Sequence, residues 1–243
     1  MATESLLATL VFAAIFLFGQ RLHITSSSRT ALSFGAGVTT AYVFVRMLPE
    51  MNEAGNAFVA VTAHMALPTP ELRIYVSALA GFILFYALEN MVAWSREQVR
   101  PINGAQEKLS PVFILHVGGF ALYAWLVCYL MVRGITAKPV PIALYAVAMG
   151  LHFIGIDHSL AREDGAAYLT LGRFILAGAA LAGWASAILT EVSKPVVITG
   201  FGLVSGGVIM NSMIMELPTE RDGRLAPFVL GAIGYTGLLA LIR

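Results

Sequence analysis

Eight apolar stretches dominate the sequence, and each is long enough to cross a lipid bilayer. They lie at roughly 5–20, 31–49, 74–94, 111–132, 140–158, 168–189, 195–216 and 225–242. A membrane-spanning helix needs about 20 predominantly apolar residues. Inside a bilayer, only helices and closed barrels satisfy all of their backbone hydrogen bonds. We therefore expect an all-α polytopic membrane protein with eight transmembrane helices, in one integral membrane domain that covers residues 1–243.

The composition also argues for a protein that lies in a membrane. Hydrophobic residues make up 58% of the 243 residues and charged residues only 12%, whereas about 25% of residues are charged in a soluble domain. The net charge of +1 provides no basic surface for a phosphate backbone, so nucleic-acid binding is not expected. The single cysteine, Cys128, excludes an intrachain disulfide and a CxxC metal or redox motif.

Two boundaries of the expected spans admit more than one interpretation. The first apolar run has the position of a signal peptide, but no basic residues precede it, it has no small-residue cleavage site, and Glu4 lies before it. We therefore expect it to be a span. The segment 50–73 is expected to be a loop that could hold a short interfacial helix.

The distribution of Lys and Arg predicts the topology. Nine of these residues lie on the side of the loops that follow the first, third, fifth and seventh spans, and five lie on the opposite side. Positive residues are enriched in the cytoplasmic loops of membrane proteins. We therefore expect those loops in the cytoplasm and both termini outside it, in a multi-pass protein of the cell (inner) membrane.

The second and seventh spans share a pattern that indicates an internal repeat. One runs from Gly37 to Pro49 and the other from Gly206 to Pro218; both end in Leu-Pro, and an acidic residue follows each. Because the expected topology gives the two spans opposite directions, the pattern predicts an inverted repeat that relates spans 1–3 to spans 6–8, with spans 4 and 5 between them. The alternative is coincidence, since glycine and Leu-Pro are common at the ends of membrane helices.

Ten polar or charged residues fall inside the expected spans, where each is energetically costly and therefore a functional candidate. They are Arg46, Glu89, Asn90, His116, His152, Asp157, His158, Arg173, Asn211 and Glu216. Four of them lie within about two turns of a span end, where side chains reach headgroup water. For these four, Arg46, His158, Arg173 and Glu216, a structural role is the favoured interpretation.

His116 and His152 are predicted to lie at similar depths in the membrane. The spans that carry them form an antiparallel hairpin, with His116 about as far before the turn as His152 is after it. At 1.5 Å per residue, their depths are expected to differ by about 6 Å. The alternative interpretation is that each histidine is a hydrogen-bonded packing residue.

Further polar groups are expected in the same layer as these histidines. Glu89, Asn90 and Asn211 lie a few residues from the cytoplasmic ends of their spans. Imidazole, carboxylate and amide groups together suit a divalent transition metal such as zinc. Asp157 and His158 follow one turn below His152, where they either extend this site or end the helix.

These features resemble the ZIP family of divalent metal transporters, and the resemblance covers nearly the whole chain. It includes eight spans, both termini outside, a 3+2+3 inverted plan, and the glycine-to-Leu-Pro pattern. In that family the fourth and fifth spans carry the metal site, with His-Asn-x-x-Asp/Glu on one and His-Glu-x-Pro-His-Glu on the other. The resemblance implies transport of a divalent cation across the bilayer.

The metal-site motifs are only partly present in this chain. The corresponding segments read His116-Val-Gly-Gly-Phe120 and His152-Phe-Ile-Gly-Ile-Asp157-His158. The first histidine of each motif is present, whereas the asparagine, the acids and the proline are absent. The resemblance therefore implies a one-metal site formed by His116 and His152, with Asp157 or Glu89 as a further ligand.

Three functions are compatible with these observations. The first is a divergent ZIP-like transporter that moves a divalent cation by alternating access. The second is a non-transporting membrane protein of the same fold with a structural or regulatory role. The third is haem ligation by His116 and His152, which requires both imidazoles to face one wide gap. No hydrolase motif is present, so we do not expect an enzyme, and small residues on the later spans are compatible with a homodimer.

Overall fold

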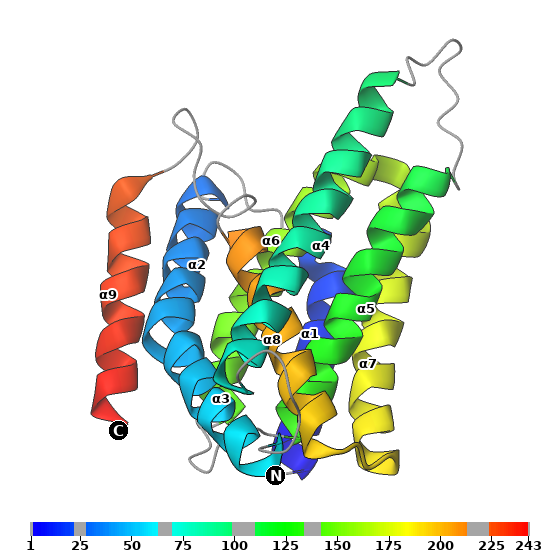
Figure 1. Cartoon of the computed structure of the whole chain (residues 1–243). Helices are drawn as coiled ribbons and strands as arrows, with labels where there is room; N and C mark the ends of the chain where they lie inside the picture. The colour runs from blue at the N-terminus through cyan, green and yellow to red at the C-terminus, as the bar shows by residue number, and fades with distance from the viewer. Residues whose placement is uncertain are drawn as a thin grey trace.

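The computed structural model describes residues 2–21, 28–62, 70–98, 110–133, 142–212 and 224–242. Within these ranges the chain forms a bundle of helices (Figure 1). The α-helices are α1 (Ala2–Phe18), α2 (Ser28–Tyr42), α3 (Leu48–Thr62), α4 (Pro70–Gln98), α5 (Pro111–Arg133), α6 (Ile142–Ala167), α7 (Arg173–Leu189), α8 (Lys194–Asn211) and α9 (Leu225–Leu241). Adjoining them are a 3-10 helix, η1 (Gly19–Arg21), and two π-helices, η2 (Val43–Met47) and η3 (Tyr168–Gly172).

Five helical stretches in the described residues are long and apolar enough to cross a membrane. They are Thr30–Asn56, Leu72–Ser95, Pro111–Arg133, Ile142–Leu189 and Lys194–Asn211. The helices α1 and α9 coincide with the first and last expected spans, but with 17 residues each they fall short of that length. The all-α prediction is confirmed, and the apolar helices are consistent with a membrane protein. The arrangement of eight spans stays a prediction.

The outer faces of several helices carry large exposed apolar side chains. On α4, Leu84 and Trp94 are 62% and 63% exposed, and on α9 Leu230 and Ile233 are 66% and 67% exposed. A soluble monomer rarely exposes apolar side chains in such numbers. Lipid tails provide an apolar environment for these side chains, so the exposed faces agree with insertion in a bilayer.

The 48-residue stretch Ile142–Leu189 changes direction sharply at Gly165. Gly165 has φ 51° and ψ −124°, and it is the only glycine with a positive φ in the described residues. This backbone conformation is open to glycine and strained for residues with a Cβ. The chain turns back here, so α6 and α7 run in opposite directions (Figure 1). The prediction that this helix ends at 158 is therefore wrong, because the break lies at Gly165.

The second expected span also continues beyond its predicted end at 49. The helix passes through η2 into α3, which ends at Thr62, so the first half of the segment 50–73 is helical. This agrees with the prediction that the segment could hold a short helix, but the helix continues directly from the preceding span. In an α-helix the ring of Pro49 clashes with the carbonyl of Val45, four residues earlier. Val45 lies within the π-helix η2, whose wider turn accommodates the proline and lets the helix continue.

Helices α2 and α9 pack tightly along each other through reciprocal glycines. A Cβ added to Gly37 of α2 would collide with the carbonyl oxygen of Phe228 in α9. A Cβ added to Gly231 of α9 would in turn collide with the carbonyl oxygen of Phe34 in α2. The two backbones therefore touch directly, as small residues at membrane helix contacts allow.

Helices α4 and α8 pack in the same manner. A Cβ added to Gly206 of α8 would collide with the carbonyl oxygen of Ala78, and one added to Gly81 of α4 with that of Leu203. In both pairs, each glycine faces the carbonyl three residues before the partner's glycine. The chain runs downward in α2 and α9 and upward in α4 and α8 (Figure 1), so the second pair repeats the first in the opposite direction.

Candidate metal centre

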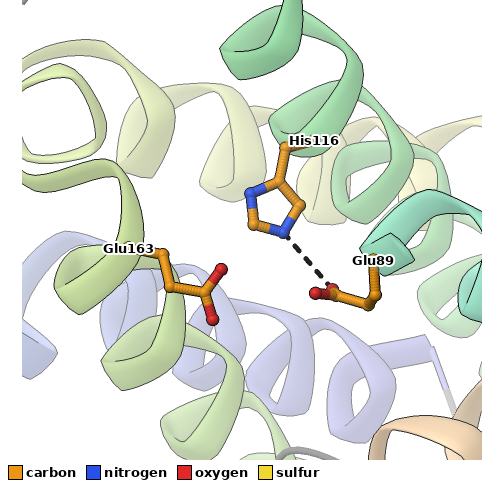
Figure 2. Close-up of side chains that lie close together, drawn as sticks. All are labelled: Glu89, His116 and Glu163. Atoms are coloured by element: carbon orange, nitrogen blue, oxygen red, sulfur yellow. Dashed lines mark hydrogen bonds and ion pairs between the residues drawn. The ribbon is translucent and has the colours of Figure 1, made fainter. Parts of the chain in front are cut away.

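Three acid or imidazole side chains from three different helices point toward one another (Figure 2). Glu89 lies in the last third of α4, His116 in the second turn of α5, and Glu163 in the last turns of α6. Each offers one ligand atom, and these atoms lie within 4.8 Å of one another. His116 is fully buried, whereas Glu89 and Glu163 are partly buried. We call this group the Glu89–His116–Glu163 triad.

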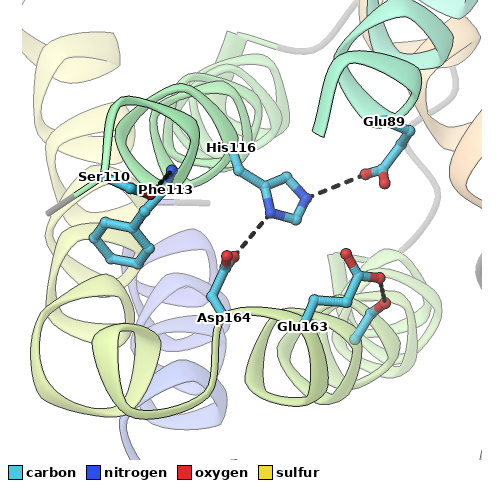
Figure 3. Close-up of polar contacts among 7 residues, drawn as sticks. Glu89, Ser110, Phe113, His116, Glu163 and Asp164 are labelled. Carbon is cyan, nitrogen blue, oxygen red and sulfur yellow. Dashed lines mark hydrogen bonds and ion pairs between the residues drawn. The ribbon is translucent and has the colours of Figure 1, made fainter. Parts of the chain in front are cut away.

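Carboxylates face both ring nitrogens of His116 (Figure 3). Its Nε2 lies 3.3 Å from Glu89 Oε1, and its Nδ1 lies 2.8 Å from Asp164 Oδ2. Asp164 is 8% exposed. When a histidine binds a metal through one nitrogen, a carboxylate on its other N–H fixes the ring orientation and raises its basicity. Asp164 has the position of such a partner at Nδ1 of His116. The other ring nitrogen, Nε2, lies on the side of Glu89 and is the one left for a metal.

A second hydrogen bond orients Glu163. The hydroxyl of Ser159, one turn earlier on α6, donates to Glu163 Oε1 at a distance of 3.0 Å (Figure 3). A ligating carboxylate is commonly held by such a bond. Both His116 and Glu163 therefore have partners that fix their side-chain directions.

The position of His116 follows from the way α5 begins. Ser110 precedes the helix, Pro111 occupies the first helical position, and the Ser110 hydroxyl accepts a hydrogen bond from the Phe113 amide at 3.1 Å. This is the pattern of an N-cap with proline at the first position. The ring of Phe120, one turn further on, packs edge-on against the imidazole of His116, with ring centroids 5.4 Å apart. The imidazole thus has an apolar wall on its inner side.

The acidic pair Glu163 and Asp164 reaches His116 because of the direction of helical side chains. Side chains in an α-helix tilt toward its N-terminus. Because α5 and α6 are antiparallel, His116 tilts outward along the bundle and the two acids tilt inward toward it. Gly165 then turns the chain away directly after Asp164, so the acids lie in the final turns before the break.

His152, expected beside His116, lies deeper in the bundle. Its Nε2 is 2.8 Å from the hydroxyl of Tyr123 on α5, and both side chains are buried. Tyr123 follows His116 by seven residues, which corresponds to about 10 Å along a helix. The structure therefore does not bring His152 into the triad.

Asp157 also lies apart from the triad. Its Oδ2 accepts a hydrogen bond from Gln20 Nε2 at 2.8 Å, and its Oδ1 accepts one from the Tyr168 hydroxyl at 2.5 Å. These partners come from η1 and η3, so the carboxylate joins three segments of the chain. We call this group the Asp157 cluster.

The remaining predicted residues differ in their environments. Asn90 and His158 are exposed, and Arg46 forms an ion pair with Glu50 at 2.5 Å. Asn211 is fully buried, and neither of its side-chain polar atoms has a hydrogen-bond partner among the described residues. Glu216 lies outside the described residues.

Glu163 and Asp164 belong to the candidate site but were not predicted from the sequence. They lie between the fifth and sixth expected spans, where a loop was expected. A signal for them was present. His116 lies about as far before the hairpin turn as the residues just beyond Asp157 lie after it. The next acids along α6 from there are Glu163 and Asp164. The glycine that directly follows is the stronger helix terminator, so the helix could have been extended to it.

The donor set of the triad fits a divalent cation. One imidazole nitrogen and two carboxylate oxygens are ligands for zinc and for the neighbouring first-row metals. Three carboxylates, those of Glu89, Glu163 and Asp164, surround one imidazole, so a dication offsets their excess negative charge. No protein-family model and no curated protein matches the sequence.

Proposed function

We propose that this chain is a membrane transporter for a divalent metal cation such as zinc, with the ion bound by the Glu89–His116–Glu163 triad. The convergence of three possible ligand atoms within 4.8 Å is the observation that carries the proposal. Each atom comes from a different stretch that is long and apolar enough to cross a membrane. Ionisable side chains are costly inside a bilayer, and they commonly mark ion pathways. Ligands on separate helices allow the coordination shell to open when the helices move.

The repeated glycine contacts support a transporter architecture. The α4–α8 pair repeats the α2–α9 pair in the opposite direction, with Gly37 and Gly206 at the start of the two glycine-to-Leu-Pro segments. Inverted repeats are typical of transporters that work by alternating access. These contacts support a 3+2+3 arrangement of eight spans and a likeness to the ZIP family.

The proposal includes a topology. Lys and Arg are more frequent in the loops that follow α4 and α6, which favours a cytoplasmic location for those loops. The triad lies near the same ends of α4 and α6, so this topology places it on the cytoplasmic side, with both termini outside in the inner membrane. Close packing of small residues is compatible with a homodimer.

A non-transporting protein of the same fold is the second candidate function. Its support is that Glu89 and Asp164 already engage both nitrogens of His116, which links α4, α5 and α6 without a metal. In that case the network is a structural or regulatory connection rather than a binding site.

Uptake of radioactive zinc into proteoliposomes tests the two candidates. The transporter predicts saturable uptake by the unchanged protein and none by the double variant His116→Ala with Glu163→Gln. The variant His158→Ala is the matched control, because His158 is exposed on the same helix as Glu163. Absence of uptake by the unchanged protein, together with no metal in the purified protein by elemental analysis, contradicts the transporter and favours the second candidate.

A further inference from the structure

Asn211, at the end of α8, is a buried polar side chain without a hydrogen-bond partner among the described residues. It is fully buried, and its Oδ1 and Nδ2 form no hydrogen bond with any described residue. The great majority of buried polar groups are hydrogen-bonded, so each exception calls for an explanation such as a bound ion or water. The amide is therefore available to bind an ion or a water.

The direction of Asn211 follows from the contacts of Gly207, one turn earlier on the same helix. A Cβ at Gly207 would lie 3.0 Å from the ring of Phe85 on α4 and 3.3 Å from that of Tyr123 on α5. Residues four apart lie on nearly the same face of a helix. Asn211 therefore points into the space between α4 and α5, as Gly207 does.

The depth of Asn211 follows from the contacts between α4 and α8. The helices α4 and α8 run in the same direction (Figure 1), and their reciprocal contacts place Gly206 level with Gly81. Asn211, five residues after Gly206, is therefore level with Tyr86 of α4. Glu89 lies about one turn further along the same direction.

The α4–α5 interface at this level leads directly to the triad. The ring of Phe85 contacts that of Phe120, with centroids 5.7 Å apart, and Phe120 in turn contacts the imidazole of His116. On the next turn, Glu89 meets His116 at 3.3 Å. Asn211 therefore approaches the triad from its inner side, opposite Glu163, which comes from α6.

We propose that Asn211 supplies its side-chain oxygen as a fourth ligand to the cation held by Glu89, His116 and Glu163. This inference rests on the proposed function, because it assumes that the triad binds a cation. The complete set is one imidazole nitrogen, two carboxylate oxygens and one amide oxygen. Such an oxygen-rich set suits Zn²⁺ and Mn²⁺, whereas soft thiolate or thioether ligands select Cu⁺.

The proposal gives Asn211 a role in metal selectivity. A neutral amide oxygen adds a ligand without adding charge, and oxygen ligands are those that Mn²⁺ prefers. Replacement of the oxygen by an imidazole nitrogen, as in Asn211→His, shifts the preference toward Zn²⁺. Removal of the donor, as in Asn211→Leu, weakens the binding of both ions and of Mn²⁺ more strongly.

Competitive titration of the full-length protein in detergent micelles with Zn²⁺ and Mn²⁺ tests this assignment. We expect Asn211→Leu to lower Mn²⁺ affinity by about 10–100-fold, the range seen when a supporting group of a metal site is lost. Asn211→Asp retains an oxygen donor of the same size and is expected to bind both ions at least as tightly as the unchanged protein. Asn90→Ala is the matched control, since Asn90 is an exposed carboxamide on α4 next to Glu89.

Thermal unfolding of the same variants separates a ligand from a packing residue. Without metal, Asn211→Leu is expected to be at least as stable as the unchanged protein, because it removes a buried amide without a partner. Addition of metal is then expected to raise its unfolding temperature less than that of the unchanged protein.

Each outcome decides between the two proposals. If the unchanged protein binds neither ion, the proposed function fails and this inference fails with it. If the unchanged protein binds metal and Asn211→Leu binds both ions with the same affinities, the proposed function stands. In that case the amide faces a buried water, and its assignment as a ligand is overturned.

Discussion

The triad and the Asp157 cluster lie within two turns of each other on α6 but differ in the balance of acids and donors. Around His116, three carboxylates face one imidazole. Around Asp157, two donors, Gln20 and Tyr168, face one carboxylate. A buried acid is therefore not by itself a metal ligand. The excess of carboxylates over donors distinguishes a group that attracts a cation from one that connects segments of the chain.

The two groups also differ in the segments that they join. The triad draws on α4, α5 and α6, which are long apolar helices, whereas the Asp157 cluster draws on the short helices η1 and η3 beside α6. Hydrogen bonds at the ends of helices hold connecting segments in place. We therefore expect the triad to determine metal affinity and the Asp157 cluster to determine stability.

Replacement of His116 by alanine has the largest expected effect on metal affinity. It removes the only nitrogen ligand of the triad, and even the loss of a supporting group costs about 10–100-fold in affinity. We expect more than about 100-fold weaker Zn²⁺ binding in a competitive titration. Asp157→Asn is the control and is expected to leave the Zn²⁺ affinity unchanged. Equal losses of Zn²⁺ affinity in both variants would show that the two groups act as one site.

Asp164→Asn has the next largest effect. The amide retains the size of the side chain but loses the charge that orients His116 through Nδ1. Zn²⁺ affinity is expected to fall by about 10–100-fold, which can be measured by the same titration. Ser159→Ala removes the hydrogen bond to Glu163. Its Zn²⁺ affinity is expected to lie between that of Asp164→Asn and that of the unchanged protein.

Gly165→Ala affects both groups, because Gly165 lies between Asp164 and Tyr168. Open space surrounds the position, so the effect comes from the backbone conformation rather than from a clash. A residue with a Cβ held in such a conformation costs about 1–3 kcal/mol. Thermal unfolding in detergent measures this loss. The control is Gly178→Ala, where the position is also open but the backbone is helical.

Tyr168→Phe has the smallest expected effect and acts on stability alone. It removes one of the two hydrogen bonds to the Asp157 carboxylate, and the bond from Gln20 remains. A loss of about 1 kcal/mol in unfolding free energy is expected, with no change in Zn²⁺ affinity. Tyr86→Phe on the exposed face of α4 is the control. A change in Zn²⁺ affinity in Tyr168→Phe would contradict the separation of the two groups.

The long apolar helices could be predicted from the sequence, but two of their ends could not. The expected spans ended at 49 and 158, next to the acidic residues Glu50 and Asp157. Both are accommodated within helical segments, since Arg46 pairs with Glu50 and Tyr168 donates to Asp157. A charge marks the end of a membrane helix only when it has no partner in the fold, and the sequence does not show its partners.

The candidate site was predicted in part. The cost of ionisable groups in a membrane correctly drew attention to Glu89 and His116, which the structure brings together. Depth along a helix was estimated without the tilt of the side chains. That tilt separates His116 from His152 and brings Glu163 toward His116. The rotation about the helix axis also matters, because Asp157 lies on a different face of α6 from Glu163.

The reciprocal glycines between α4 and α8 determine which of the proposed ligands would move together. Backbones that touch directly leave little freedom for one helix to slide along the other, so we expect this pair to move as a rigid body. Glu89 belongs to this body, together with Asn211, while His116 and Glu163 belong to α5 and α6. If the triad and Asn211 bind a cation as proposed, a displacement of the pair relative to α5 and α6 would divide the ligands into two halves. The ion would then be released by separation of the halves rather than by loss of a single ligand.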